Sequence, residues 1–365
     1  MNKITPLVEV LREHLNWRPQ RLELAAHFIL ALSVKQTVNQ HPLAECFDSS
    51  AQVSSNEKRL QRFFRDQEID LLATTSLFPQ LLGLKEPWVL CLDRTNWKLG
   101  GANLNFLVLA VAVNGVAIPL TWTLLNKQGI SSMKERIALM KSFIAVFPKE
   151  QLRCLTADRE FIGREWLEFL QNEGIPFCIR VREDQKLTNF KGQERSGKVL
   201  FRNTRRTHYE YWKHRKIGGL PVHLTVYKHA TGELVILIHS LPSNSPDAAL
   251  KLYAERWKIE TLFQALKSRG FNLEDTHMTQ LNRLSKLMFM ITLAFVWAYR
   301  IGEWSHQQKP IPLKKHGRLS QSIFKRGLSI LAHLIYVSVR KYNDYLNAVQ
   351  FLSTKPKTLK LNTFY

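Results

Sequence analysis

The sequence predicts an α/β protein in which a mixed sheet, covered by helices, is flanked by helical regions at both ends of the chain. Residues 86–182 show three adjoining strand patterns and then a helix–strand–helix–strand order, which is typical of a mixed sheet with helices on its faces. Before and after this stretch, apolar residues recur at helical spacing. A chain of 365 residues is also too long for one core and suits two to four domains.

The charge of the chain predicts a polyanionic partner. Lys and Arg exceed Asp and Glu by 22, while 45% of residues are hydrophobic, as in a folded globular protein. Nucleic acid is the expected partner, because every neutralised phosphate releases counterions. An anionic membrane is disfavoured: the longest apolar run, Leu287–Tyr299, has 13 residues and is too short to span a bilayer. This run is interpreted as a buried helix.

The cysteines and the start of the chain indicate a reducing compartment. Four scattered cysteines form no C-x-x-C pair, which argues against a zinc site and against a disulfide framework: Cys46, Cys91, Cys154 and Cys178. Residues 1–10 lack the pattern of a signal peptide. We therefore expect a cytoplasmic protein.

Residues 1–85 are predicted to form a helical N-terminal domain. Leu7–Leu15 and Leu22–Val38 have helical spacing, and a third helix is expected to begin at Ser54 or Ser55. Apolar residues share one face of the third helix: Leu60, Phe63 and Phe64. Basic residues share another: Lys58, Arg62 and Arg65. The basic face is either an ordinary solvated surface or part of a small DNA-binding domain, and the net charge supports the second interpretation.

The strands and helices of the predicted core alternate in residues 86–182, and the core resumes at 246–302. The expected strands are Trp88–Leu92, Asn103–Val113, Val116–Leu124, Leu152–Ala157 and Ile175–Val181. The expected helices are Lys134–Phe147 and Arg164–Glu173. Asn114-Gly115 is a strong hairpin signal between two of the strands.

Two further regions complete the division of the chain. Residues 183–245 are basic and strand-like, with candidate strands Thr207–Trp212, Val222–Lys228 and Leu234–His239, and are interpreted as a β-rich insertion. Residues 303–365 form a basic C-terminal region with an amphipathic helix over Ser320–Val337, expected to serve dimerisation or DNA contact.

Two aspartates follow predicted strands of the core. Asp93 comes after Trp88–Leu92, and Asp158 comes after Leu152–Ala157, so both are expected at an edge of the sheet. An isolated aspartate in such a place is more often a turn former or a helix cap. Arg94 and Arg159 directly follow the two aspartates and are candidate DNA contacts.

A predicted helix over residues 253–267 supplies a third acid. At ~100° per residue, four polar residues fall on a stripe about 60° wide: Tyr253, Arg256, Glu260 and Lys267. The adjacent stripe is apolar and can pack on the sheet. An ordinary salt-bridged helix would explain the pair Arg256 and Glu260, although Arg before Glu is the weaker orientation.

Three carboxylates at one edge of a sheet suit hard cations such as Mg²⁺, which take oxygen ligands. A pair of such ions activates a nucleophilic oxygen and stabilises the leaving oxygen in phosphoryl transfer. Cations beside Glu260 would hold the phosphates. Asp93, Asp158 and Glu260 are therefore predicted to be metal ligands and catalytic residues of a phosphodiester-cleaving enzyme.

The spacing of the third element resembles the DDE transposases of bacterial insertion sequences, in particular the cut-and-paste branch with a Tyr-Arg-Glu-Lys signature. That signature has two, three and six intervening residues, as Tyr253, Arg256, Glu260 and Lys267 do. The contexts of the first two acids are also similar to that branch: Asp93-x-Thr95 and Asp158-Arg-Glu-Phe161.

The resemblance implies a ribonuclease-H-like catalytic core interrupted by the β insertion. It implies that Asp93, Asp158 and Glu260 bind two Mg²⁺ ions, for which Mn²⁺ substitutes, and that Tyr253, Arg256 and Lys267 contact the transposon end. The implied enzyme cuts double-stranded DNA at the terminal inverted repeats, through a hairpin, and joins the 3′-OH ends to target DNA. Synapsis of two ends implies a homodimer on DNA.

One departure from the branch concerns the flipped base. Some relatives place a stacking Trp on the last strand of the insertion, where this chain has Leu234-Val235-Ile236. Either Tyr209, Tyr211 or Trp212 supplies the platform, or the flipped base is held differently. Each of the three aromatics could equally pack in the sheet. Two alternative functions stay open: a related structure-specific nuclease without strand transfer, and a catalytically silent DNA-binding regulator derived from a transposase.

Overall fold

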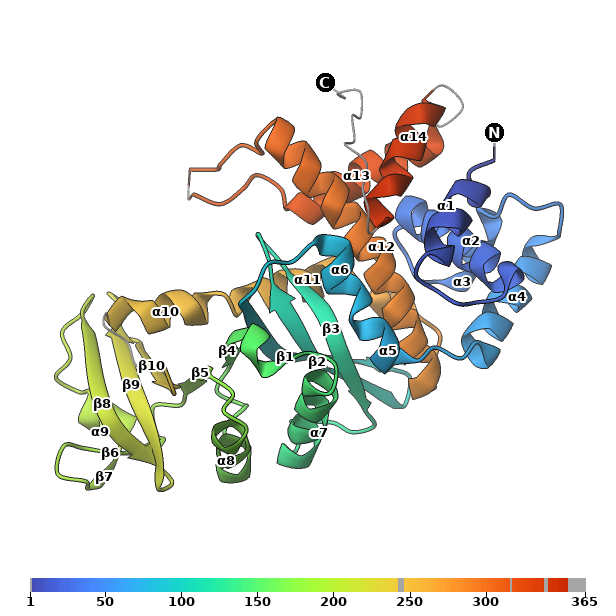
Figure 1. The fold of residues 1–365 in the computed structure, drawn as a ribbon. Helices are drawn as coiled ribbons and strands as arrows, with labels where there is room; N and C mark the ends of the chain where they lie inside the picture. The colour runs from blue at the N-terminus through green and yellow to red at the C-terminus, as the bar shows by residue number, and fades with distance from the viewer. Residues whose placement is uncertain (1, 242–245, 316, 338–340, 354–365) are drawn as a thin grey trace. The chain divides into compact units, whose positions relative to one another are not determined.

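The computed structural model describes residues 2–241, 246–315, 317–337 and 341–353 (Figure 1). The chain divides into two compact units. The helical unit comprises Met1–Leu84, Trp97–Leu104 and Leu262–Tyr365. The sheet unit comprises Lys85–Asn96 and Asn105–Thr261. The helical regions from both ends of the chain thus belong to one unit, and the strands of the predicted core belong largely to the other.

The helical unit is built around α12 (Leu281–Gln308), which packs on helices from both ends of the chain. The N-terminal helices are α1 (Ile4–Arg12), α2 (Pro19–Lys35), α3 (Gln40–Glu45), α4 (Val53–Asp66), α5 (Leu71–Thr75) and α6 (Leu77–Leu82). The C-terminal elements are η2 (Leu273–Asp275), α13 (Ile323–Tyr336), α14 (Tyr342–Val349) and η3 (Gln350–Leu352). The amphipathic helix expected over Ser320–Val337 is confirmed as α13, whose N-cap Ser322 accepts a hydrogen bond from the Lys325 N–H.

Helix α12 is a core helix. Its length and composition would allow it to cross a membrane, but 83% of its most apolar window is buried inside the structure. The whole run Leu287–Tyr299 is buried, which confirms the interpretation of this segment as a buried helix. α12 crosses α13 so closely that a Cβ on Gly327 would lie 1.7 Å from the Ala298 carbonyl oxygen. Glycine is therefore required at this crossing.

Helix α4 follows the predicted amphipathic pattern. Leu60, Phe63 and Phe64 are buried against the other helices, as expected from their spacing. The helix begins at Val53, before the expected Ser54 or Ser55, and its N-cap makes no side-chain hydrogen bond. The first turn was therefore misplaced by one or two residues, because the serines suggested a cap that the chain does not use.

The sheet unit contains one large mixed sheet of eight strands within the described residues, in the order β3-β2-β1-β4-β5-β10-β9-β8 (Figure 1). Its strands are β1 (Trp88–Leu99), β2 (Ala102–Ala112), β3 (Ala117–Leu125), β4 (Leu152–Ala157), β5 (Phe177–Val181), β8 (Tyr209–Ile217), β9 (Leu220–Lys228) and β10 (Leu234–His239). β1, β4 and β5 run parallel, whereas β10, β9 and β8 continue the sheet in antiparallel pairs. The predicted hairpin is confirmed: β2 and β3 are antiparallel and turn through Gly115, at φ 76°.

Helices cover both faces of this sheet. The remaining elements of the unit are α7 (Met133–Ile144), η1 (Lys149–Gln151), α8 (Arg164–Asn172), α9 (Gly197–Leu200), α10 (Pro246–Ala254), α11 (Trp257–Leu266) and a small hairpin of β6 (Lys186–Thr188) and β7 (Glu194–Ser196). α10 packs on the face that carries Val89, Cys154 and Cys178. The opposite face carries Trp88, whose ring meets Phe147 just after α7. The predicted mixed α/β class is confirmed.

One strand differs from its predicted length. The pattern predicts a strand that ends at Asp93, but β1 continues to Leu99. The prediction failed because the residues after Leu92 are polar and look like a loop, whereas the backbone stays extended. Asp93 therefore projects from within a strand and not from its end.

Candidate active site

Strand register brings Asp93 and Asp158 to neighbouring positions. β1 and β4 are parallel with Leu92 opposite Ala157, so the aspartates that follow these residues lie side by side. Side chains alternate between faces along a strand, which places Asp93 on the same face as Val89. That is the face covered by α10, so both acids lie on the side of the sheet on which Tyr253 packs.

The segment that carries the third acid is not one regular helix. Sequence analysis placed Tyr253 to Lys267 on a continuous helix, but α10 ends at Ala254 and α11 begins at Trp257. The turn between them is held by tight i to i−3 bonds, from Arg256 N–H to Tyr253 O and from Ile259 N–H to Arg256 O. The single-stripe geometry is therefore wrong. No Gly or Pro marks the break, so the local sequence gives no signal of it.

A buried thiol supports this turn. Cys91, on β1, donates from Sγ to the carbonyl oxygen of Glu255 at 3.4 Å. The Glu255 carbonyl lies between α10 and α11, where fewer backbone N–H groups are available to bind carbonyl oxygens. The thiol of Cys91 supplies a weak hydrogen bond to this carbonyl. The interpretation of Cys91 as a small core residue is confirmed by its burial.

Arg256 joins two of the three acids. Its side chain is 4% exposed, and its guanidinium donates from Nη1 to Asp93 Oδ2 at 3.4 Å and from Nη2 to Glu260 Oε1 at 2.9 Å. Burial of a guanidinium is expensive unless charged partners compensate. The two carboxylates are these partners. Within the described residues, the Nε of Arg256 is buried and makes no hydrogen bond.

The second acid, Asp158, is held by the tyrosine of the signature. Tyr253 donates from its hydroxyl to Asp158 Oδ1 at 3.2 Å. The guanidinium of Arg256 lies over the rings of both Tyr253 and Trp257, with Cζ 5.6 Å and 4.5 Å from the ring centroids. Asp93, Asp158 and Glu260 thus belong to one network through Tyr253 and Arg256.

The electrostatics of this network reflect its depth. The pKa of Asp93 is raised to about 6, mainly by burial. The Arg94 N–H and the charge of Arg256 oppose this rise, and the charges of Glu160 and Asp158 contribute to it. Burial also raises the pKa of the Tyr253 hydroxyl to about 12. Both shifts follow from the depth of the network, because burial disfavours the charged form of an acid.

The arginines that follow the two aspartates differ in their surroundings. Arg94 donates from Nε to Glu160 at 2.8 Å and is half-buried. Arg159 is exposed. Glu160 was not among the predicted site residues, although it stands two residues after Asp158. Its pairing with Arg94 depends on strand register, which the motif alone does not reveal.

The described residues of the network supply carboxylate oxygens, but they do not form a preformed metal-binding site. Among the described residues, no group of three His, Cys, Asp or Glu side chains is arranged to hold a metal ion. The cation between Asp93 and Glu260 is instead the Arg256 guanidinium. The carboxylate donors fit a hard divalent ion in kind. Their present spacing fits a guanidinium.

The other predicted DNA contacts lie in the helical unit. Lys267 pairs with Glu274 at 2.7 Å, and its ammonium lies 5.6 Å from the ring centroid of Trp97. The three predicted basic contacts on α4 are exposed: Lys58, Arg62 and Arg65. Arg65 is engaged by the neighbouring Asp66 at 2.6 Å, so the phosphate-binding capacity of this face is reduced by one charge.

The aromatic candidates for a base platform have different environments. Tyr211 stacks on His239, and Trp212 is packed between Phe190 and Phe201, so both contribute to packing. Tyr209 is half-exposed and stacks on Tyr227. Trp257, which sequence analysis did not single out, is 52% exposed beside Arg256.

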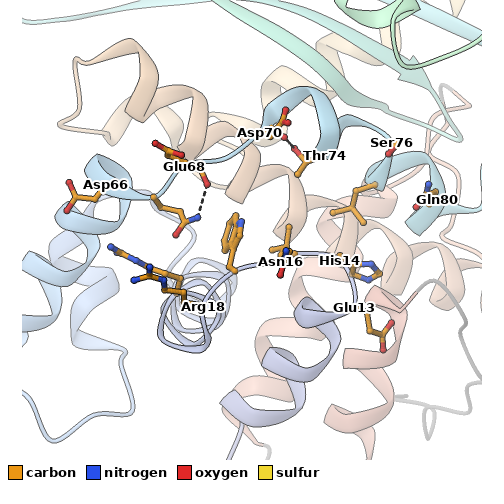
Figure 2. A pocket seen from close by; sticks show the side chains of 15 residues that line it. Glu13, His14, Asn16, Arg18, Asp66, Glu68, Asp70, Thr74, Ser76 and Gln80 are labelled. Atoms are coloured by element: carbon orange, nitrogen blue, oxygen red, sulfur yellow. Dashed lines mark hydrogen bonds between the residues drawn. The ribbon is translucent and has the colours of Figure 1, made fainter.

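One cavity belongs to the helical unit. It has a volume of about 870 Å³ and is lined by polar groups of both signs (Figure 2). Acids come from Asp66, Glu68 and Asp70, and bases include Arg18 and Arg21. No acid of the predicted catalytic set lines this cavity.

Comparisons with known proteins show similarity to transposases. A cryo-EM structure of the piggyBac transposase synaptic complex with hairpin DNA is 14% identical, with a TM-score of 0.47 and coverage of 98% of this chain and 83% of that chain. No curated protein matches the sequence. The family model of the transposase DDE domain matches residues 84–297, more than half of the chain. This chain therefore belongs to the transposase DDE domain family.

Proposed function

We propose that this protein is a cut-and-paste DNA transposase of the Tyr-Arg-Glu-Lys branch, with Asp93, Asp158 and Glu260 as its catalytic acids. One observation carries the proposal: in a chain of the DDE family, these three acids, Tyr253 and Arg256 form a single contact network on one face of a mixed sheet. The strand order β3-β2-β1-β4-β5 supports a ribonuclease-H-like core for that sheet.

The proposed chemistry is phosphodiester transfer in four steps. Water attacks the phosphorus at the element end, the P–O3′ bond breaks, and a 3′-OH is released on the element. That 3′-OH attacks a phosphorus of the opposite strand and displaces the 3′-oxygen of the flanking DNA, which closes a hairpin and frees the element. A second water attacks the hairpin phosphorus, and the P–O3′ bond breaks to restore the 3′-OH. This 3′-OH attacks a phosphorus of target DNA and displaces a 3′-oxygen of the target strand, which joins the element to it.

DDE transposases generally use divalent metal ions, and we assign Mg²⁺, as two ions, to this chain. Asp93, Asp158 and Glu260 would hold the ions, which would supply charge stabilisation for the attacking and leaving oxygens. Tyr253, Arg256, Lys267 and the exposed Arg159 are proposed to contact the DNA. We further propose that the protein acts as a homodimer on DNA in the cytoplasm.

The direct test is cleavage of DNA that carries the element's own ends, with Mg²⁺ and with EDTA. We expect Asp93→Ala, Asp158→Ala and Glu260→Ala each to lower single-turnover cleavage by at least about a thousandfold, as loss of essential catalytic groups does. End binding should persist. Glu255→Ala is the matched control, because Glu255 pairs with Lys258 beside the network and is not part of it.

The outcomes separate the three candidate functions. Cleavage followed by joining to a target plasmid supports a transposase. Cutting of branched DNA without joining would indicate a structure-specific nuclease, and end binding without any cutting would indicate a silent regulator. Cleavage that survives loss of any one acid would overturn the site assignment.

A further inference from the structure

The guanidinium of Arg256 would have to bind two kinds of partner, a DNA phosphate and the carboxylates of the network. Under the proposed function it contacts a DNA phosphate, yet in the structure its Nη atoms are directed to Asp93 and Glu260. With a 4% exposed side chain, the guanidinium is not presented to solvent. An arginine binds a phosphate bidentately through its guanidinium N–H groups. The Nη groups that bind the two carboxylates are therefore not free to bind a phosphate in this way at the same time.

Removal of Arg256 from its present place would leave a strong negative charge. Asp93 is 18% and Glu260 is 40% exposed, so both carboxylates are partly shielded from water, and each loses its closest cation when Arg256 moves. Unpaired buried charge is costly, so departure of the guanidinium requires another cation at the acids. A divalent ion is the replacement that hard carboxylate oxygens favour.

The exposed side chain of Trp257 gives the guanidinium of Arg256 a surface along which it can move away from the carboxylates. Its guanidinium lies 4.5 Å from the ring centroid of Trp257, and that ring is 52% exposed. Its Nε is buried without a hydrogen bond among the described residues, so the present position leaves one donor unused. A guanidinium that slides along the indole keeps a cation–π contact while its donors become accessible.

We propose that Arg256 is a resident counter-ion that holds Asp93 and Glu260 until a divalent metal replaces it, and that a DNA phosphate then takes the released guanidinium. This inference rests on the proposed function and adds a coupling to it. Metal binding and phosphate binding reinforce each other through one side chain. Such coupling is reciprocal, so each ligand raises the affinity of the other by the same factor.

The coupling also has a use for the enzyme. Without DNA, Arg256 competes with the metal, and Asp93 and Glu260 stay paired with its guanidinium. With DNA, the phosphate draws the guanidinium away, and the acids become available to metal. Metal-loaded acids therefore accumulate on DNA and not in the free protein.

The test measures Mn²⁺ binding to the full-length protein by EPR of free Mn²⁺, without any cleavage readout. Arg256→Gln removes the competing charge and should tighten Mn²⁺ binding about tenfold in the absence of DNA, a typical size for coupling between two sites. A short duplex with a 5′ phosphate should tighten Mn²⁺ binding to the wild type by a similar factor. It should have little effect on Arg256→Gln.

A matched control removes a neighbouring charge. Arg180 influences Asp158 and Tyr253 electrostatically, but its guanidinium pairs with Glu233. Arg180→Gln should therefore change Mn²⁺ affinity much less than Arg256→Gln and should preserve the effect of the duplex. Equal effects of the two variants would mean a general charge effect and would overturn the proposal.

Stability provides a second measurement. Arg256→Gln should melt at a lower temperature than the wild type without metal, because two carboxylates lose their counter-ion, and Mn²⁺ should restore most of the difference. If Arg256→Gln does not fold, Arg256→Lys carries the test. A lysine keeps the positive charge but lacks the planar guanidinium with its several N–H donors. Mn²⁺ should therefore bind Arg256→Lys more tightly than the wild type, by a smaller factor than the one expected for Arg256→Gln.

Failure of this inference is distinguishable from failure of the proposed function. Mn²⁺ binding that is lost in Asp93→Ala but unchanged in Arg256→Gln overturns the counter-ion role alone. Mn²⁺ binding that is the same in the wild type and in Asp93→Ala removes the metal site on which the proposed function depends.

Discussion

His239, on β10, should make the stability of the sheet unit depend on pH. Its ring is 1% exposed and lies against the imidazole of His223 and the stacked ring of Tyr211. One ring nitrogen, Nδ1, is 2.9 Å from the Leu241 carbonyl oxygen, and Nε2 is 3.0 Å from the hydroxyl of Thr225. A neutral ring that donates from Nδ1 and accepts at Nε2 satisfies both contacts.

Protonation would disturb this arrangement. The pKa of His239 is lowered from 6.5 to about 4, mainly by burial. The hydrogen bond to the Leu241 carbonyl oxygen opposes this shift, and the positive charge of His223 contributes to it. Because the folded-state pKa lies below the unfolded value, the stabilisation is present above pH 6.5 and is lost as pH falls towards 4. At about 1.4 kcal/mol per pKa unit, the loss between pH 7 and pH 4 is about 3 kcal/mol.

Hydrogen exchange over residues 220–239, corrected for the intrinsic exchange rate, measures this loss where it occurs. In the wild type, the free energy of opening should fall by about 3 kcal/mol between pH 7 and pH 4. In His239→Gln, which has no charge to gain, most of this fall should disappear. The exposed His208 provides the control, since His208→Gln should behave like the wild type. Equal losses in the wild type and in His239→Gln would refute the reasoning.

Two further predictions concern the helical unit and the charge of the chain. Gly327→Ala should destabilise the protein by about 3 kcal/mol or more, although Ala is favoured over Gly in helices, because its Cβ would lie 1.7 Å from a carbonyl oxygen of α12. Gly101→Ala, where a Cβ meets nothing within 4 Å, should leave the melting temperature within a degree or so, and similar melting temperatures for both variants would contradict the crossing argument. Affinity for DNA should fall log-linearly with salt, as the net charge of +22 implies, and a flat salt titration would remove the electrostatic basis of binding.

The elements that sequence analysis predicted well are those with an unbroken local pattern. β4 has the predicted bounds, Leu152–Ala157, because its apolar run ends abruptly at Asp158. The hairpin between β2 and β3 follows from Asn114-Gly115, whose preference for positive φ is local. The extension of β1 to Leu99 and the turn between α10 and α11 were missed, because backbone pairing and tertiary contacts determine them.

In the candidate site, too, the sequence indicates which residues belong to the motif but not which of them are in contact. Motif spacing was enough to select Tyr253, Arg256 and Glu260. It did not reveal that Arg256 also contacts Asp93, since that contact joins residues 163 positions apart and depends on how α10 packs on the sheet. Glu160 was overlooked for the same reason. Residue types follow from spacing, whereas pairings follow from the fold.

The position of β10 limits how this protein can be shortened. β10 pairs with β5, the last parallel strand of the core, and so links β9 and β8 to the same sheet. Deletion of residues 183–245 would leave β5 as a bare edge, open to pairing with other chains. A shortened protein made by that deletion is therefore expected to aggregate. Engineering for a smaller protein would have to keep β10 and shorten the chain at the outer strands, where β8 already forms an edge.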